Sequence, residues 1–291
     1  MIANKSIKET RDKSFDLNPV IVTIFLSLAI SLPQLGFIKL IDMVGCFDKL
    51  MASTDIKNLI ILYLTSISLG LAYLFAKKIL KRTDLSLGLV NDRKLRSYGV
   101  GVFLGIGLII LISLILWAFG FAEISKNNMV FDKKIFIFYI VGWMIQGFEE
   151  EFLLRSILMN QLGSRGKISL AIIANSFIFS ILHLSNSGFT FLAFVNLSLI
   201  GIIFSLLFYM TDSIYISAGA HSFWNMAMAN IFGIVVSGDV ASPVTILNTR
   251  LKGNSLVSGG SFGLEASIVT SLVFIIVLLI LIRKIKNRPC D

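Results

Sequence analysis

Charged residues are scarce in this sequence. They make up 15% of its 291 residues, whereas hydrophobic residues make up 56%; an ordinary soluble domain is about 25% charged and about 45–50% apolar. A soluble fold could not bury so many apolar side chains, so the composition excludes an ordinary globular protein. The net charge of +9 does not indicate nucleic-acid binding, because the basic residues occur in short runs beside apolar segments, as membrane-surface anchors do.

Cysteine is nearly absent as well. Cys46 and Cys290 lie far apart and have no CxxC or metal-binding spacing, so neither a disulfide framework nor a zinc knuckle is expected. The basic N-terminal region is followed by a long apolar stretch without a small-residue cleavage signature. We therefore expect a retained first helix rather than a signal peptide.

Eight apolar segments approach or exceed the length of about 20 residues that a membrane-spanning helix needs. They predict an all-α fold, a single membrane domain (1–291) that is a polytopic helix bundle with eight transmembrane helices. Basic residues in the short loops set the orientation: 17 fall on the side of the N-terminus and 7 on the other side. Both termini are therefore expected in the cytoplasm. The predicted segments are 18–38, 58–76, 98–121, 134–160, 168–185, 189–210, 213–234 and 264–282.

The connections between these segments carry further signals. Gly163 is expected to end the fourth helix, and Thr211-Asp212-Ser213 predicts a tight turn between the sixth and the seventh. The longest linker, 237–263, is rich in Gly and Ser. It could cap the bundle or dip into it.

The few ionisable residues inside the apolar segments are the candidates for function, because charge within a membrane is costly. The fourth segment contains the run Glu149-Glu150-Glu151 followed by Arg155. The chain has only two histidines, His183 and His221, and both lie in apolar segments that are predicted to be helices.

The three glutamates are expected to differ in role. Glu151 precedes Arg155 by four residues and shares its helical face, so Arg155 is its natural counter-charge. Glu150 points about 100° away from its neighbour and is free to face the interior of the bundle. Glu149 lies on yet another side and is expected to be the expendable member.

Polar groups from two other segments can join Glu150. His221 shares a helical face with Asn225, and Phe179 can pack beneath His183. At a rise of about 1.5 Å per residue, Glu150 and both histidines lie at similar depths. A shared cluster between mid-membrane and the cytoplasmic half is therefore geometrically possible.

A carboxylate and neutral imidazoles in a cavity of low dielectric constant suit hydrolysis. Glu150 would be the general base on a water molecule, helped by His183, while His221 and Asn225 would donate to the developing oxyanion. Zinc held by Glu150, His183 and His221 is an alternative, although the sequence has no HExxH motif. Purely structural roles are also open: a charge patch near a helix end for the glutamates, and hydrogen bonding between helices for His221 and Asn225.

These residues form three motifs on successive segments, namely Glu150-Glu151-xxx-Arg155, Phe179-xxx-His183 and His221-xxx-Asn225. The motifs, in this order, resemble those of the CPBP family of CAAX proteases and bacteriocin-processing enzymes, also described as the Abi family, which includes the type II CAAX prenyl endopeptidases. The resemblance covers a core of about 134–234. It implies an intramembrane endopeptidase and favours a metal-independent mechanism of the glutamic type over a zinc mechanism, although both descriptions have been applied to the family.

The resemblance also implies a role for each motif residue. Glu150 would activate water with His183 beside it, and His221 with Asn225 would form the oxyanion site. Glu151, Arg155 and Phe179 would support these four catalytic residues.

Several expectations about the setting of the protein follow. The Lys- and Ile-rich composition suggests a bacterial source, and hence a multi-pass protein of the plasma membrane. Its partners would be the lipid bilayer and a peptide or membrane-protein substrate, without nucleic acid. Two rival functions use the same residues: a transporter or proton relay, and a non-catalytic membrane immunity or scaffold protein.

Overall fold

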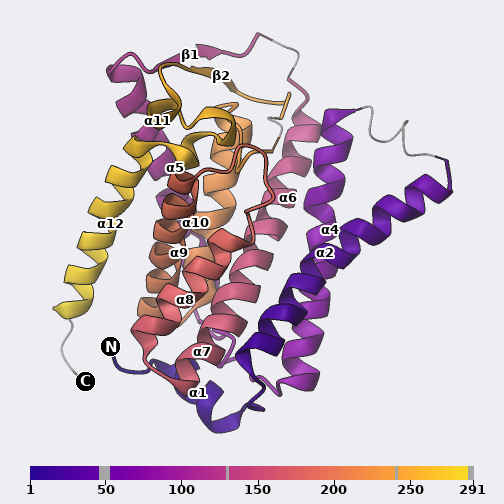
Figure 1. The fold of residues 1–291 in the computed structure, drawn as a ribbon, viewed down its shortest axis with the longest axis vertical. Coiled ribbons are helices and arrows are strands. Elements are labelled where there is room, and N and C mark those ends of the chain that lie inside the picture. The colour runs from indigo at the N-terminus through magenta and orange to yellow at the C-terminus, as the bar shows by residue number, and fades with distance from the viewer. Residues whose placement is uncertain (46–52, 129–130, 240–241, 288–291) are drawn as a thin grey trace.

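The computed structural model describes residues 1–45, 53–128, 131–239 and 242–287. Cys46 and Cys290 lie outside the described residues, so the expectation about their pairing stays a prediction. The protein is mostly helical (Figure 1). Its longer helices are α2 (Pro19–Met43), α4 (Thr54–Leu74), α5 (Lys94–Ala118), α6 (Lys133–Glu151), α8 (Ile168–Ile181), α9 (Phe191–Thr211), α10 (Ile214–Met226) and α12 (Ile268–Lys286).

Each of the eight predicted segments overlaps one of these helices. Within the described part of the chain, five helices are long and apolar enough to cross a membrane: α2, α4 with its extension to Ile79, α5, α9 and α12. The other three helices, α6, α8 and α10, do not meet this criterion, because they contain polar side chains or are shorter. The tight turn before α10 is confirmed, since Asp212 adopts a left-handed conformation (φ 54°) and Ser213 caps α10.

Among the described residues, three helices continue into π turns, whose hydrogen bonds span one residue more than those of an α-helix. The π turns are η1 (Phe75–Ile79) after α4, η2 (Phe152–Met159) after α6 and η3 (Ala227–Ile231) after α10. The helix that begins with α6 continues through η2 into α7 (Asn160–Arg165). The prediction that Gly163 ends this helix is therefore wrong. Gly163 lies inside α7. The side chain of Ile7, on the short helix α1 (Lys5–Lys13), packs against it and leaves little room for a larger residue.

Helix α10 packs unusually closely against two neighbours. Gly101 and Gly105 of α5 meet its backbone: a Cβ atom at these positions would lie 2.2 Å from the carbonyl oxygen of Ile216 and 2.3 Å from that of Ala220. On the other side, a Cβ atom at Gly147 of α6 would lie 2.5 Å from the hydroxyl oxygen of Ser222. Small residues at such spacing let helix backbones approach each other in membranes. The position of α10 is thereby fixed between α5 and α6.

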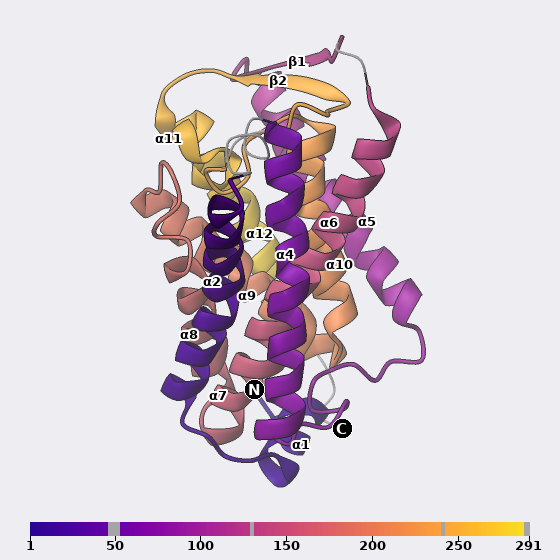
Figure 2. The same cartoon turned by 90° about the vertical axis from the view of Figure 1, so that its right-hand side faces the viewer.

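A cap closes the bundle at one end, and we define it as β1 (Ala122–Lys126) together with residues 232–239 and 242–267. It contains β2 (Leu247–Leu251), α11 (Ser255–Ser258) and two short 3₁₀ turns, Gly260–Phe262 and Leu264–Ala266. The cap lies at the end opposite α1 (Figures 1 and 2). Of the two possibilities for the 237–263 linker, the structure shows a cap.

A short two-stranded sheet in the cap adds to the helical fold that the sequence predicts. β1 and β2 pair antiparallel, with Ala122 opposite Leu251 and Lys126 opposite Leu247. Neither strand exceeds five residues, and their partners are distant in the sequence. Local alternation of polar and apolar residues is therefore too short to reveal them.

Candidate active site

A cavity of about 460 Å³ lies inside the bundle near the cap. Its walls come from α2, α4, α6, α10, the α8–α9 connection and the cap. All four predicted catalytic residues line it: Glu150, His183, His221 and Asn225. The structure therefore brings together side chains that are far apart in the sequence.

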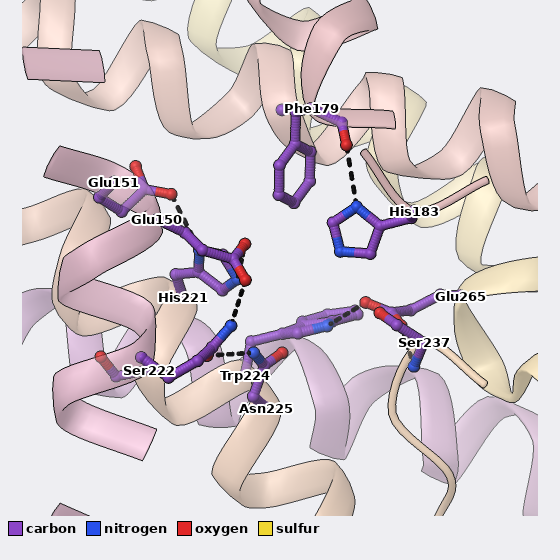
Figure 3. A network of polar contacts seen from close by, with 12 residues as sticks. Glu150, Glu151, Phe179, His183, His221, Ser222, Trp224, Asn225, Ser237 and Glu265 are labelled. Atoms are coloured by element: carbon purple, nitrogen blue, oxygen red, sulfur yellow. Dashed lines mark hydrogen bonds and ion pairs between the residues drawn. The ribbon is translucent and has the colours of Figure 1, made fainter. Parts of the chain in front are cut away.

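Glu151 is bonded to both a cation and an imidazole. Its Oε1 atom lies 2.9 Å from Nη1 of Arg155, and both side chains are fully buried. The predicted ion pair is therefore present. The same oxygen lies 2.9 Å from Nδ1 of His221, a contact that helical spacing did not predict (Figure 3).

Arg155 is enclosed by other groups of the bundle. Its Nη2 atom donates to the carbonyl oxygen of Gly201 on α9 at 3.2 Å. Its guanidinium carbon lies 5.0 Å from the ring centre of Phe179 and 5.6 Å from that of Phe204, distances that suit cation–π attraction. Arg155 thus joins α8 and α9 to the helix that carries the glutamates.

The contact with Glu151 fixes the chemistry of His221. A carboxylate only accepts hydrogen bonds, so Nδ1 of His221 must carry a proton. The other ring nitrogen, Nε2, lies 3.7 Å from Oε2 of Glu150, too far for a direct hydrogen bond. Glu150 is 19% exposed and lines the cavity, so a reacting group can reach both atoms.

Gln146, which sequence analysis missed, connects Glu150 to Asn225. Its Nε2 atom donates to Oε1 of Glu150, and its Oε1 atom accepts from Nδ2 of Asn225 at 3.0 Å. The bond to Asn225 orients the amide of Gln146, so that its NH₂ group faces Glu150. Its position four residues before Glu150, on the same helical face, is the signal that could have identified it.

His183 does not lie in a helix, which corrects the prediction. Helix α8 ends at Ile181, and the backbone N–H of His183 bonds the carbonyl oxygen of Ser180 at 3.1 Å, the spacing of a tighter turn. The helix ends early because the polar stretch after Leu184, with Gly188 in a left-handed conformation, favours a turn. His183 lies across the cavity from Glu150 (Figure 3).

The carbonyl of Phe179 orients the ring of His183. Nδ1 of His183 lies 2.8 Å from the carbonyl oxygen of Phe179 and must be its protonated nitrogen, because a carbonyl only accepts. Nε2 is then the acceptor of the neutral ring. The ring of Phe179 packs edge-on against both His183, at 4.8 Å, and His221, at 5.8 Å. The predicted packing of Phe179 against His183 is therefore present.

Two buried carboxylates also line the cavity. Glu265, in the cap, is 4% exposed and accepts hydrogen bonds from Nε1 of Trp224 (3.1 Å) and from the backbone N–H (2.8 Å) and hydroxyl (2.7 Å) of Ser237. It fastens the cap to α10. Glu149 lies on another side of α6, as expected, but it is buried and accepts from Ser68 of α4. Such burial does not suit an expendable surface charge.

The zinc alternative, with Glu150, His183 and His221 as ligands, stays a prediction. Within the described ranges, His, Cys, Asp and Glu side chains nowhere gather in groups of three that could hold a metal ion. Nδ1 of His221 contacts Glu151 and Nδ1 of His183 contacts the carbonyl of Phe179, so Nε2 is the ring nitrogen that each histidine has left for the cavity.

The cavity reaches from the middle of the bundle to its capped end. Cap residues Ser237, Asp239 and Glu265 line it, together with Lys57 near the start of α4. Glu150 lies near the middle of the helix that runs from Lys133 to Arg165. The depth of the cluster in a membrane stays a prediction.

The fold and the cavity define a helical membrane protein with carboxylates and imidazoles grouped in its interior. Residues 132–227 match a family model described as Type II CAAX prenyl endopeptidase Rce1-like. This match confirms the resemblance to the CAAX protease family that the three motifs predict, and the matched segment contains every motif residue. A search of curated proteins finds no match to the chain.

Proposed function

We propose that the protein is an intramembrane endopeptidase in which Glu150 activates a water molecule without a metal. The observation that carries this proposal is the placement of Glu150, 3.7 Å from His221, on the wall of a cavity inside a helical membrane protein. The match to a protease family over the same residues supports it.

The cluster supplies a base for the water and donors for the oxyanion. Glu150 would accept a proton from water, positioned with the help of His183 Nε2, and the water oxygen would attack the peptide carbon. The carbonyl oxygen would become an oxyanion held by Nε2 of His221 and the second hydrogen of Asn225 Nδ2. The proton on Glu150 would then pass to the leaving nitrogen as the C–N bond breaks.

His221 can donate through Nε2 only when both ring nitrogens carry protons, because Nδ1 is held by Glu151. A doubly protonated His221 gives the group of Glu150, Glu151, Arg155 and His221 zero net charge. Paired charges are far less costly to bury than an unbalanced one. Glu151 and Arg155 therefore belong to the electrostatic support of the site.

We further propose that eight helices cross the membrane, with α1 and the end of α12 in the cytoplasm. α12 runs from the cap toward the end where α1 lies (Figure 1), as an even number of crossings requires. Its last turn carries Arg283, Lys284 and Lys286. A membrane surface that retains basic loops is cytoplasmic.

Substrate trapping tests the proposed function. Glu150→Gln keeps the shape of the side chain but removes the base, so the purified variant should retain uncleaved peptide that mass spectrometry can identify. The captured peptide should be cut by the unaltered protein. Full cleavage by a correctly inserted Glu150→Gln protein would contradict the proposal and would favour a transporter, proton relay or scaffold.

A further inference from the structure

The cavity and the α1 end of the bundle differ in their access to solvent, and this difference bears on the substrate. Resting on the proposed function, we propose that the site is reached from the extracytoplasmic side. The substrate class is then a membrane-anchored polypeptide whose scissile bond lies on its outer flank. A chain tail presented from the cytoplasm does not fit this route.

The mouth of the cavity lies at the capped end. Asp239 of the cap and Ser185 of the α8–α9 connection both line the cavity and are exposed. Ser31 of α2 also lines it and is exposed, so the opening reaches the flank of the bundle as well as its end. A polypeptide anchored in the bilayer can approach such an opening from the side.

The opposite end is closed by packed side chains. Ile7 of α1 is fully buried and contacts the position of Gly163. Arg82 is 2% exposed and bonds Thr10 of α1 and Oε1 of Gln161, the latter at 2.6 Å. These contacts fill the space through which a substrate would have to pass from the α1 end.

The interior between these contacts and the cavity is also filled by buried side chains. Within η2, Ile157 is 0%, Leu158 1% and Met159 0% exposed. Above them lies the fully buried ion pair of Glu151 and Arg155. A path from the α1 end to Glu150 would have to break this pair and leave a buried charge without its partner, which is strongly unfavourable.

Basic residues identify the sides. The α1 end has a basic helix terminus in α1, with Arg11 and Lys13 in its last turn, and Arg165 in the last turn of α7. Over the whole sequence, 17 basic residues fall on the side of the α1 end and 7 on the side of the capped end. The positive-inside rule therefore places the closed end in the cytoplasm and the mouth of the cavity outside.

Single cysteines can test this assignment in intact bacterial cells that express the full chain. Cys46→Ser and Cys290→Ser remove the native thiols; Asp239→Cys then places a thiol at the mouth, and Lys8→Cys places a matched one on the exposed face of α1. A charged, membrane-impermeant methanethiosulfonate is applied before or after permeabilisation. Unreacted thiols are counted by a mass-shifting maleimide after denaturation.

We expect the reagent to block Asp239→Cys in intact cells, and to block Lys8→Cys only after permeabilisation. Protection of Asp239→Cys in intact cells, or reaction of Lys8→Cys there, would overturn the inference. Neither result depends on catalysis. If Asp239→Cys reacts as expected while Glu150→Gln stays fully active, the proposed function fails and the assignment of the mouth stands.

Peptides captured by Glu150→Gln provide a second readout. Their cleavage sites should lie on the flank of the membrane anchor that is poor in Lys and Arg, the extracytoplasmic flank. Cleavage sites on the Lys- and Arg-rich flank would contradict the proposed substrate class.

Discussion

Arg82, near the α1 end, and Glu150, in the cavity, are both ionisable side chains inside the bundle, but their surroundings differ. Arg82 donates to Thr10, to Gln161 and to the carbonyl oxygen of Ile157. Glu150 bonds Gln146 and has its other carboxylate oxygen beside His221, open to the cavity. A charge surrounded by protein partners stabilises one packing arrangement, whereas a charge with an unoccupied side can bind water or substrate. The comparison separates structural charges from chemical ones.

The largest effect is expected for Glu150→Gln. Loss of a general base lowers rates by about 10²–10⁴-fold, so cleavage of a captured substrate should fall by at least about 10²-fold. The free energy of unfolding should change little, since Glu150 is part-exposed and Gln keeps its size. Glu123→Gln, on the exposed cap strand, is the matched control and should remain active. Equal losses of activity in Glu150→Gln and Glu123→Gln would contradict the distinction between structural and chemical charges.

Arg155→Met should mainly lower the stability of the protein, whereas Glu150→Gln should mainly lower its activity. Removing one partner of a buried pair costs about 3–5 kcal/mol, so the free energy of unfolding, measured by SDS titration in mixed micelles, should fall by that amount. The double variant Glu151→Gln with Arg155→Met leaves no unpaired charge and should recover part of the loss. A double variant less stable than Arg155→Met alone would contradict a structural ion pair.

Gly105→Ala tests the close contact that positions α10. The new Cβ atom would lie 2.3 Å from the carbonyl oxygen of Ala220, so α5 and α10 must separate. Overpacking of this kind costs about 1–3 kcal/mol, and activity should fall with it because α10 carries His221. Gly107→Ala, two residues along the same helix with open space around it, is the control. Similar instability in both would contradict the contact as the cause, because Gly→Ala inside a helix by itself favours the helix.

The smallest effect is expected for Gln146→Ala. The variant removes a hydrogen bond to Glu150 and another to Asn225 but leaves both side chains in the cavity. We expect a decrease in kcat of about tenfold, equivalent to about 1.4 kcal/mol, with little change in KM or stability. Gln146→Asn should not restore kcat, because its shorter side chain cannot reach both partners. A change confined to KM would indicate substrate contact instead.

The helices and the ion pair could be predicted because their signals are local. Apolar runs located the helices, and the spacing of Glu151 and Arg155 placed them on one face. The contact of Glu151 with His221 could not be predicted, since it depends on how closely α6 and α10 approach. Gly147 allows that approach, but a single glycine in a helix does not reveal its partner.

The contacts of Glu265 in the cap could not be predicted, for a similar reason. Glu265 follows a Gly- and Ser-rich linker and belongs to none of the three motifs. Its importance to the cavity arises from contacts with Trp224 and Ser237, which the fold brings together from separate segments. His183 was placed in a helix because apolar residues continue to Leu184, although the backbone leaves α8 at Ile181.

The π turn η2 has a consequence for how this chain can vary in length. An extra residue in a turn shifts the angular phase of everything beyond it, by about 100° for each residue of an α-helix. The half of the helix before η2, which is α6, directs Glu150 toward the cavity. The half after η2, which is α7, directs Gln161 toward Arg82. Deleting one residue between 156 and 159 would restore regular α-helix and rotate these two halves against each other. Relatives of this chain should therefore keep the number of residues between Glu150 and Gln161 constant, even where the residues themselves differ.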